Sequence, residues 1–257
     1  MLDETAVVAA NREIAESTSL LTLRAPRIVE SGVSPGQFVN VAAGDASRLL
    51  RRPVSVMAVD RANGVLDLAI MRVGEGTRAI CSMPCGSAVQ LLGPLGRPFT
   101  LGGAKRVYCV GGGMGVAPVR FAAGAFIAEG CDVTAFYGFK SSAYIFGLKG
   151  LACRAHLTTD DGSMGRRGPI TEALTDAIGQ ARPDLIIACG PEAMLRAVKD
   201  IAIRDRIPCQ ISLEARMACG VGACLVCACK AGASGNAYRR VCADGPVFDI
   251  GEVNIDE

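Results

Sequence analysis

The chain has 257 residues, half of them hydrophobic and 20% charged, and no apolar run approaches the roughly 18 residues that a membrane-spanning helix needs. The 27 Lys and Arg residues nearly balance the 25 Asp and Glu residues, so the net charge of +2 gives no reason to expect a nucleic acid or an anionic membrane as partner. The start, MLDETAVVAA, lacks the basic and apolar regions of a secretion signal, so we expect a cytoplasmic protein, where twelve cysteines favour metal or redox chemistry over disulfides.

Residues 1–102 are predicted to form a small antiparallel β-barrel. Short runs such as TSLLTLRAP, GQFVNVAAG and GVLDLAIM alternate apolar and polar residues between glycine and proline turns. The stretch LLRRPVSV places Arg52 where it can hold a phosphate, with Ser55 as a further donor, and RVGEGT offers a glycine turn beside a hydroxyl. Without context, a solvated arginine pair next to a strand explains the same residues.

Residues 103–212 are predicted to form an α/β domain that binds a nucleotide. The run RVYCV precedes GGGMGVAPV and a helix-like segment, and DLIIACGPEAMLRAVKD repeats the order of strand, glycine turn and helix. This order implies a parallel sheet with ligands beyond the carboxyl ends of its strands, where glycines let a pyrophosphate approach the backbone. The motif is G-x-G-x-x-P rather than G-x-G-x-x-G, so taken alone a plain tight turn explains it equally well.

Residues 213–257 contain the most specific pattern in the chain. Cys219, Cys224 and Cys227 have the spacing C-x4-C-x2-C, with Cys242 further on, which is the arrangement of ligands for a plant-type [2Fe-2S] cluster. Zinc is the competing metal for four thiolates, although structural zinc sites usually have paired C-x2-C knuckles. Cys229 alternates with Cys227 along an extended segment, so we interpret it as a packing residue. Most of the other cysteines have apolar neighbours and are expected to be buried.

In this order, the motifs resemble the ferredoxin–NADP reductase superfamily, and the C-terminal cysteines narrow the resemblance to the electron-transfer subunits of class 1B dihydroorotate dehydrogenase. The resemblance covers nearly the whole chain, and SLEARMACGVGACLVCACK and RVCADGPVF are its most specific segments. It implies three cofactors: FAD on the barrel, NAD on the α/β domain and a [2Fe-2S] cluster. It also implies an FMN-containing catalytic subunit as partner, in a heterotetramer, which oxidises dihydroorotate to orotate in pyrimidine biosynthesis.

The family's site residues can be placed on this sequence one at a time. The resemblance assigns FAD to Arg52, Pro53, Val54, Ser55, Gly74, Gly76 and Thr77, and NAD to Gly111, Gly113, Gly115, Pro118, Cys189, Gly190 and Pro191. It assigns the iron atoms to Cys219, Cys224, Cys227 and Cys242. Val54 departs from the superfamily, where many members have a tyrosine against the flavin ring, so the group that stacks on that face is left open.

In this interpretation the protein is an NAD-dependent oxidoreductase subunit, and FAD joins the two-electron chemistry of nicotinamide to the one-electron chemistry of the cluster. No residue is predicted to act on a pyrimidine. Cys189 is expected near the nicotinamide, Glu214 is a candidate close to the flavin, and His156 is interpreted as structural. Lys140 would suit the 2′-phosphate of NADP, whereas the acidic segment TTDDGS would disfavour it, and the resemblance favours NAD.

Two alternatives stay open at this point. A related flavin and iron–sulfur reductase could deliver electrons to a ferredoxin or another acceptor, because the modules are shared and the acceptor lies outside this chain. The non-enzymatic alternative is a scaffold protein stapled by zinc.

Overall fold

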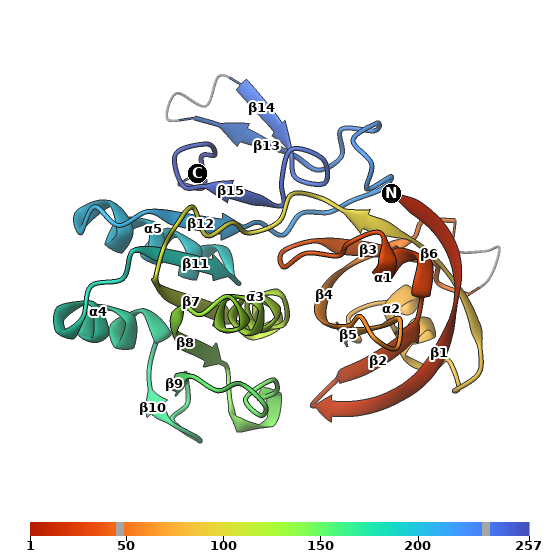
Figure 1. Ribbon diagram of the computed structural model, residues 1–257, viewed down its shortest axis with the longest axis horizontal. Coiled ribbons are helices and arrows are strands. Elements are labelled where there is room, and N and C mark those ends of the chain that lie inside the picture. Colours follow the sequence, from red (N-terminus) through yellow and green to blue (C-terminus); the bar gives the residue numbers. More distant parts are fainter. Residues whose placement is uncertain (45–48, 233–236, 257) are drawn as a thin grey trace.

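The computed structural model describes residues 1–44, 49–232 and 237–256. Figure 1 shows a barrel built from the N-terminal third, an α/β sheet built from the middle of the chain, and a C-terminal segment that lies across both. The predicted combination of barrel, parallel-sheet domain and small C-terminal segment is confirmed. Among the described residues, no helix is both long and apolar enough to cross a membrane.

The barrel closes in the strand order β1-β2-β5-β4-β3-β6, and every neighbouring pair in it is antiparallel. Every second side chain of a strand points into the barrel. In β1, for example, Ala6 and Val8 are buried while the intervening Val7 is exposed. Its elements are β1 (Leu2–Ala15), β2 (Thr18–Arg24), α1 (Pro26–Glu30), β3 (Phe38–Val41), β4 (Arg52–Asp60), β5 (Val65–Met71), α2 (Glu75–Cys81) and β6 (Ala88–Leu95).

The central sheet has seven strands in the order β10-β9-β8-β7-β11-β12-β15, and only the last pair is antiparallel. Its first six strands and their connections are β7 (Arg106–Gly112), η1 (Gly113–Gly115), α3 (Val116–Ala128), β8 (Asp132–Phe139), η2 (Ser142–Tyr144), β9 (Arg154–Thr159), β10 (Arg166–Arg167), α4 (Ile170–Gln180), β11 (Leu185–Cys189), α5 (Glu192–Arg204) and β12 (Cys209–Ser212).

The helices cover both faces of this sheet. On one face α4 and α5 pack through residues such as Leu174 and Val198. On the other face α3 packs against the sheet and also against Leu20 and Met57 of the barrel. Because α3 is covered on both sides, it is apolar around most of its circumference, as its sequence VAPVRFAAGAFIA shows. The helix α3 therefore joins the two large domains.

The C-terminal segment forms the hairpin of β13 (Ala228–Ala231) and β14 (Ala237–Arg240), and then β15 (Val247–Asp249). The strand β15 pairs antiparallel with β12, so it extends the central sheet. Cys227, Cys242 and Phe248 belong to the same apolar core as α5 and as Phe38 of the barrel. The predicted boundary after residue 212 falls at the end of β12, while the predicted end at residue 257 lies outside the described residues.

Candidate functional site

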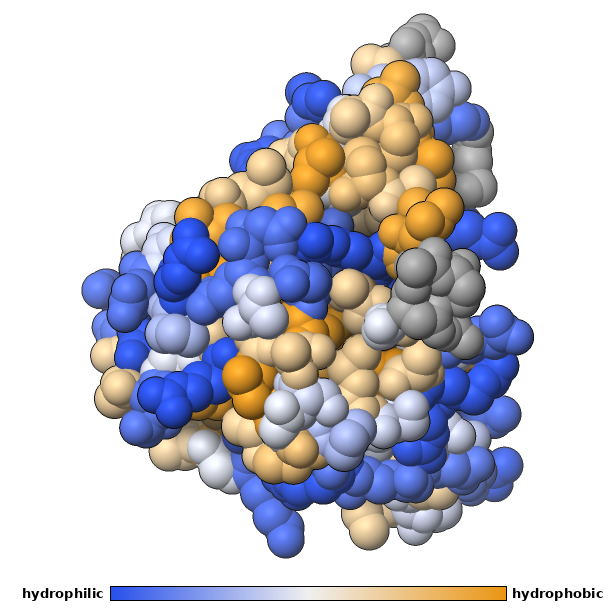
Figure 2. All heavy atoms as spheres, turned by 90° about the vertical axis from the view of Figure 1, so that its right-hand side faces the viewer, coloured by the Kyte–Doolittle hydropathy of each residue, from blue (hydrophilic) through white to orange (hydrophobic). Residues whose placement is uncertain are grey.

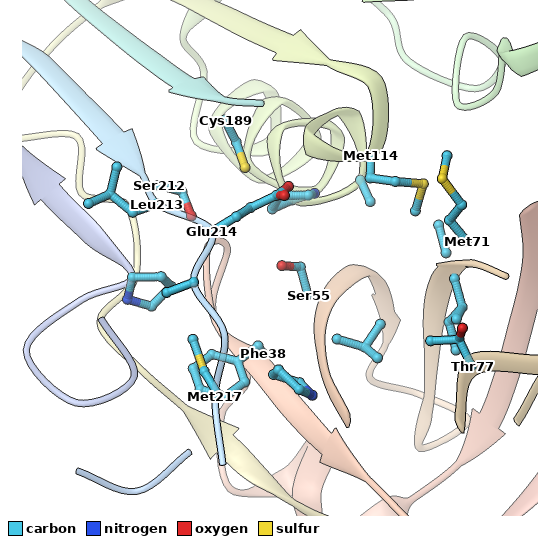
Figure 3. A pocket seen from close by; sticks show the side chains of 18 of the residues that line it. Phe38, Ser55, Met71, Thr77, Met114, Cys189, Ser212, Leu213, Glu214 and Met217 are labelled. Atoms are coloured by element: carbon cyan, nitrogen blue, oxygen red, sulfur yellow. The ribbon is translucent and has the colours of Figure 1, made fainter. Parts of the chain in front are cut away.

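A cavity of about 380 Å³ lies where the three segments meet (Figure 3). The barrel contributes β4, the end of β5 and the turn before α2, and the other walls come from the start of α3, the end of β11 and the chain after β12. A cavity of this size with a largely apolar lining and a few polar groups is typical of a cofactor site. The lining residues are Phe38, Pro53, Val54, Ser55, Ala69, Ile70, Met71, Val73, Thr77, Met114, Ala117, Pro118, Cys189, Ser212, Leu213, Glu214, Ala215, Met217 and Pro246.

Seven residues singled out from the sequence line this cavity together. They come from all three segments, although up to 161 residues separate them in the chain, from 53 to 214. Figure 3 shows the Ser55 hydroxyl across the cavity from Cys189 and Glu214. The seven are Pro53, Val54, Ser55, Thr77, Pro118, Cys189 and Glu214.

Arg52 and the glycine turn 74–77 lie together beside the cavity. The Arg52 guanidinium covers Gly76 so closely that a Cβ atom there would lie 2.3 Å from its Nε atom. Thr77 Oγ1 accepts hydrogen bonds from the backbone N–H groups of Val73 and Gly74 and donates one to the Gly74 carbonyl. A guanidinium fixed over a glycine turn presents the positive charge and close backbone approach that a pyrophosphate requires.

The two glycine turns of the α/β domain interlock at the carboxyl ends of β7 and β11. A Cβ atom on Gly115 would lie 2.1 Å from the carbonyl oxygen of Cys189, and one on Gly190, whose φ is +156°, would lie 2.9 Å from the Gly112 nitrogen. Gly113 is different, because its φ is +52° but nothing lies within 4 Å of a Cβ atom placed there. Gly115 and Gly190 are therefore needed for close packing of the two turns, whereas Gly113 leaves its backbone open to a ligand.

Gly111 and Pro191 complete the predicted set in these turns. A Cβ atom on Gly111 would lie 2.9 Å from the Cα atom of Val116, so this glycine allows α3 to start directly above β7. Pro191 precedes the first residue of α5, where a missing N–H costs little. Both residues shape the turns and are absent from the lining of the cavity.

Cys189 and Glu214 line the same corner of the cavity, and the pKa values of both side chains are raised there. Cys189 is only 3% exposed, and burial together with the nearby Glu214 carboxylate raises the pKa of its thiol, while the Ser212 hydroxyl lowers it. Glu214 borders the cavity and is accessible there, yet burial among protein atoms raises the pKa of its carboxyl. Cys189 is therefore a neutral thiol at neutral pH rather than a nucleophilic thiolate.

The four cysteines of the predicted cluster site gather in one loop region. Backbone N–H groups point at their sulfur atoms: Val221 and Cys224 donate to Cys219 Sγ at 3.4 Å, and Gly222 donates to Cys242 Sγ at 3.1 Å. The Sγ atoms of Cys227 and Cys242 lie 3.2 Å apart. Gly220 and Gly222 adopt φ angles of +69° and +85°, which turn the chain tightly enough to aim these groups.

The sulfur atoms differ in their affinity for protons. The Val221 N–H group lowers the pKa of Cys219 to about 6, whereas burial beside Cys227 raises the pKa of Cys242 to about 12. A bound metal must therefore displace the proton of Cys242. Within the described residues, no three His, Cys, Asp or Glu side chains form a compact site for a single ion. Four neighbouring cysteine sulfurs, with backbone N–H groups donating to those of Cys219, Cys227 and Cys242, are the ligand chemistry that an iron–sulfur cluster uses.

The structure also places several residues away from these sites. Cys229 is half-buried on β13 and packs against the core, as the sequence predicts for it. His156 stacks on Phe136 with ring centroids 4.8 Å apart and is absent from the cavity lining. Cys85 is an exception to the burial expected for most cysteines outside the cluster motif, since it is exposed in the turn after α2, where its sulfur lies 3.0 Å from the Ala9 carbonyl.

Sequence reasoning missed part of the site. Phe38, Met71, Met114 and Met217 line the cavity, but apolar residues carry no motif that separates a cavity wall from a core. Arg240 was missed too, although it donates to the Gly222 carbonyl at 3.2 Å and pairs with Asp244 beside the cysteines. The acidic residue two positions after Cys242 was the available signal.

Two family models match the chain. The model described as "Oxidoreductase FAD-binding domain" matches residues 5–99, and "Iron-sulfur cluster binding domain of dihydroorotate dehydrogenase B" matches residues 214–254. Curated relatives from Bacillus caldolyticus and Geobacillus kaustophilus, each named "Dihydroorotate dehydrogenase B (NAD(+)), electron transfer subunit", are 41% identical over 97% of this chain and 98% of their own length.

Solved structures agree on the fold. A chain of an NADH-dependent reduced ferredoxin–NADP oxidoreductase, studied for flavin-based electron bifurcation, is 27% identical with a TM-score of 0.86, covering 98% of this chain and 91% of that one. The Amycolatopsis cytochrome P450 reductase GcoB is 24% identical with a TM-score of 0.67, covering 80% and 67% of the two chains, and shows the fold alone.

The fold, the cavity and the matching domains define a flavoprotein oxidoreductase that carries an iron–sulfur segment at its C-terminus. FAD and an iron–sulfur cluster are thus the cofactors of its two matched domains. The chain belongs to the family of dihydroorotate dehydrogenase B (NAD(+)) electron transfer subunits.

Proposed function

We propose that this chain passes electrons from an FMN-containing subunit that oxidises dihydroorotate, through a [2Fe-2S] cluster and FAD, to NAD+ in the cytoplasm. One observation carries the proposal most directly. The segment after β12 lines the cavity with Glu214 and Met217 and supplies the first cysteine of the cluster site, Cys219, two residues later. A flavin in the cavity and a cluster in the loop would therefore be neighbours along one short stretch of chain.

FAD would bind at the barrel side of the cavity. Arg52 and the turn of Gly74, Gly76 and Thr77 would hold the pyrophosphate, while Pro53, Val54 and Ser55 on β4 would border the flavin ring. FAD, when bound, supplies a centre that exchanges a hydride with nicotinamide and single electrons with the cluster. Val54 is too small to cover a flavin ring, and Met71 and Met114 at the same cavity offer polarizable side chains for that face.

NAD would bind at the opposite side of the cavity, which the α/β domain forms. The open backbone at Gly113 and the N-terminus of the 13-residue helix α3 would accept the pyrophosphate. Gly111, Gly115, Gly190 and Pro191 shape the two turns, and Pro118 and Cys189 would border the nicotinamide. Cys189 stays neutral and Glu214 binds a proton more readily than an exposed carboxylate, so neither places a fixed negative charge against the ring at mildly acidic pH.

For the cluster, the proposal assigns Cys219, Cys224, Cys227 and Cys242 as iron ligands. The backbone N–H groups that donate to the sulfurs of Cys219, Cys227 and Cys242 stabilise negative charge there, which is the role such donors have in iron–sulfur proteins. Cys219 follows the cavity-lining residue Met217 by two positions, so it would connect the cluster to the flavin side. Cys224 is exposed, and electrons would enter from the partner beside it.

The partner would dock on the exposed edge of residues 219–227, which precede β13 and are called the cluster loop below. Val221, Leu225 and Val226 flank Cys224 and are 39%, 61% and 56% exposed. Figure 2 shows apolar side chains gathered in the upper part of one face, where the C-terminal segment lies. Exposed apolar side chains grouped around an electron-transfer centre are the signature of a docking surface rather than of a solvated loop.

The experiment that tests this function is anaerobic purification of the chain together with its FMN-containing partner. The expected preparation contains FAD, iron and acid-labile sulfide, binds the partner stably, and oxidises NADH in the presence of orotate. A colourless preparation that contains zinc would overturn the proposal, and so would a loaded chain that neither binds the partner nor supports the orotate-dependent reaction.

A second function is favoured by one observation, the similarity to a chain of an NADH-dependent reduced ferredoxin–NADP oxidoreductase. The same purified chain, offered a soluble ferredoxin in place of the partner subunit, distinguishes the two. Rapid ferredoxin reduction by NADH, together with failure to bind the FMN-containing partner, would assign this second function instead.

A further inference from the structure

Asn40 is a buried polar side chain that links the barrel to the cluster loop. It lies on β3 and is 2% exposed. Its side-chain Nδ2 donates a hydrogen bond to the backbone carbonyl of Cys219 at 3.1 Å, across 179 residues of sequence. A buried amide of this kind is costly unless it is hydrogen-bonded, so the contact with Cys219 satisfies Asn40 and at the same time fixes the loop.

The loop is shaped to accept this contact. The residue after Cys219 is Gly220, whose φ of +69° places it in the left-handed region. A Cβ atom on Gly220 would lie 2.2 Å from Asn40 Nδ2, so any side chain there would push the amide away. Asn40 thus needs the space that Gly220 leaves beside it, and this need explains why a glycine directly follows the first cysteine.

The strand that carries Asn40 also forms the wall of the cavity. In the register of β3 with β4, Phe38 is opposite Ser55 and Asn40 is opposite Pro53. Phe38, Pro53 and Ser55 all line the cavity. Phe38 in addition shares an apolar core with Cys227 and Cys242. Val39 and Val41 fill the barrel interior, so this short strand contacts the cavity with Phe38 and the cluster loop with Asn40, the next position on its outer face.

We propose that Asn40 is a positioning residue, which holds the Cys219 edge of the cluster loop at a fixed separation from the cavity. The inference rests on the proposed function, in which these two places hold the cluster and FAD. Electron transfer between two centres slows steeply as their separation grows, so a loop free to move away from the barrel would transfer electrons poorly. Asn40 is not part of the cavity lining, and it reaches the proposed cluster site through the backbone carbonyl of Cys219 rather than through its sulfur.

The test uses the full chain loaded with FAD and cluster. Asn40→Asp keeps the size of the side chain but replaces the donor with a carboxylate facing the Cys219 carbonyl, and Asn40→Ser keeps a small polar group that cannot reach it. Gly220→Ala disturbs the same contact from the loop side. Gln37→Ala is the matched control, because the contacts of the Gln37 amide with described residues stay within the barrel segment: it donates to the Gly96 carbonyl and accepts from the Ser34 N–H group.

Two measurements are made on each variant. Rapid mixing with NADH follows flavin reduction and cluster reduction separately, and hydrogen exchange follows the amides of residues 219–224. In the Asn40 variants we expect flavin reduction close to the wild-type rate, cluster reduction slower by about tenfold or more, and faster exchange in the loop. The control should match the wild type in both measurements.

Each outcome decides the matter. Cluster reduction at the wild-type rate in Asn40→Asp and Asn40→Ser, or exchange unchanged in the loop, would overturn the positioning role. Equal slowing of flavin and cluster reduction would overturn it too, because the damage would then lie in the flavin site. If wild-type protein itself fails to reduce its cluster from NADH, the proposed function fails instead, so the two failures are distinct.

Discussion

Arg240 holds Asp244 through three hydrogen bonds and uses its remaining nitrogen to hold the cluster loop. Its backbone N–H, Nε and Nη2 donate to the Asp244 carboxylate at 2.8, 3.0 and 2.9 Å. Its Nη1 donates to the Gly222 carbonyl at 3.2 Å. The same guanidinium lies close enough to Cys242 and Cys227 for these residues to raise its pKa, after the larger contribution of Asp244. A permanent positive charge therefore lies beside two of the cysteines that we propose as iron ligands.

Replacing Arg240 should lower the reduction potential of the cluster. Reduction adds a negative charge, which the guanidinium stabilises, so Arg240→Gln should shift the midpoint down by on the order of tens of millivolts. Arg240→Lys, which keeps the charge but loses the bidentate contact with Asp244, should shift it less. Redox titration followed by electron paramagnetic resonance measures both. The control is Arg239→Gln on the exposed part of the same strand, and an equal shift in that variant would contradict the explanation.

Tyr137 carries a buried hydroxyl for which the described residues offer no hydrogen-bond partner. Tyr108, on the adjacent strand β7, has a partner, because its hydroxyl donates to the Ala181 carbonyl at 2.5 Å. Removing the unsatisfied hydroxyl in Tyr137→Phe should leave the free energy of unfolding unchanged or raise it, whereas Tyr108→Phe should lower it by about 1 kcal/mol. Urea unfolding of the two variants provides the measurement. A larger loss in Tyr137→Phe than in Tyr108→Phe would show that the phenol has a partner.

Much of the architecture could be predicted from the sequence, because it depends on residues that are close together in the chain. Alternating residues such as Ala6 and Val8, and the strand–turn–helix order around Gly111–Gly115, are determined by near neighbours in the chain. The glycine and cysteine motifs carry their chemistry in the spacing itself. The place of β15 beside β12 could not be predicted in this way, since VFD is three residues long and its pairing depends on the path of the whole C-terminal segment.

The walls of the cavity were predictable only where a motif marked them. Ser55 and Thr77 stand in recognisable patterns, but Met71 and Met114 have no feature that separates them from core residues. The contact between Asn40 and Cys219 joins residues of two segments through one side chain, and sequence periodicity says nothing about it. Chain-distant contacts of this kind appear only once the barrel and the C-terminal segment are packed together.

Glu214 should make the stability of the protein without cofactors depend on pH. Burial raises its pKa in the folded chain above the ordinary value of 4.5, so the unfolded chain gives up this proton more easily. The stability that the protonated carboxyl contributes is present below the unfolded pKa and is lost as the pH rises through the folded pKa. We expect Glu214→Gln to be more stable than wild type at pH 8, with a difference that shrinks as the pH falls toward the ordinary value of 4.5.

Urea unfolding of the two proteins at several pH values measures this difference. Glu16→Gln is a suitable control, because Glu16 is an exposed carboxylate that accepts a hydrogen bond from Tyr144 outside the cavity. A gap between wild type and Glu214→Gln that stays constant across the whole range would show that the carboxyl is not desolvated.

The exposed edge of the cluster loop should be the surface that binds the catalytic partner. Leu225 is 61% exposed beside Cys224 and has a φ of +61°, a conformation that Asp tolerates better than most residues. Leu225→Asp should therefore leave the fold and the visible spectrum of the cluster intact while weakening partner binding by about tenfold or more, because it puts a charge into an apolar contact. Ile203→Asp is the matched control, since Ile203 is 56% exposed on α5 and far from the loop in sequence. Binding measured by calorimetry should separate the two variants; equal weakening, or none in Leu225→Asp with the cluster retained, would place the partner on another face.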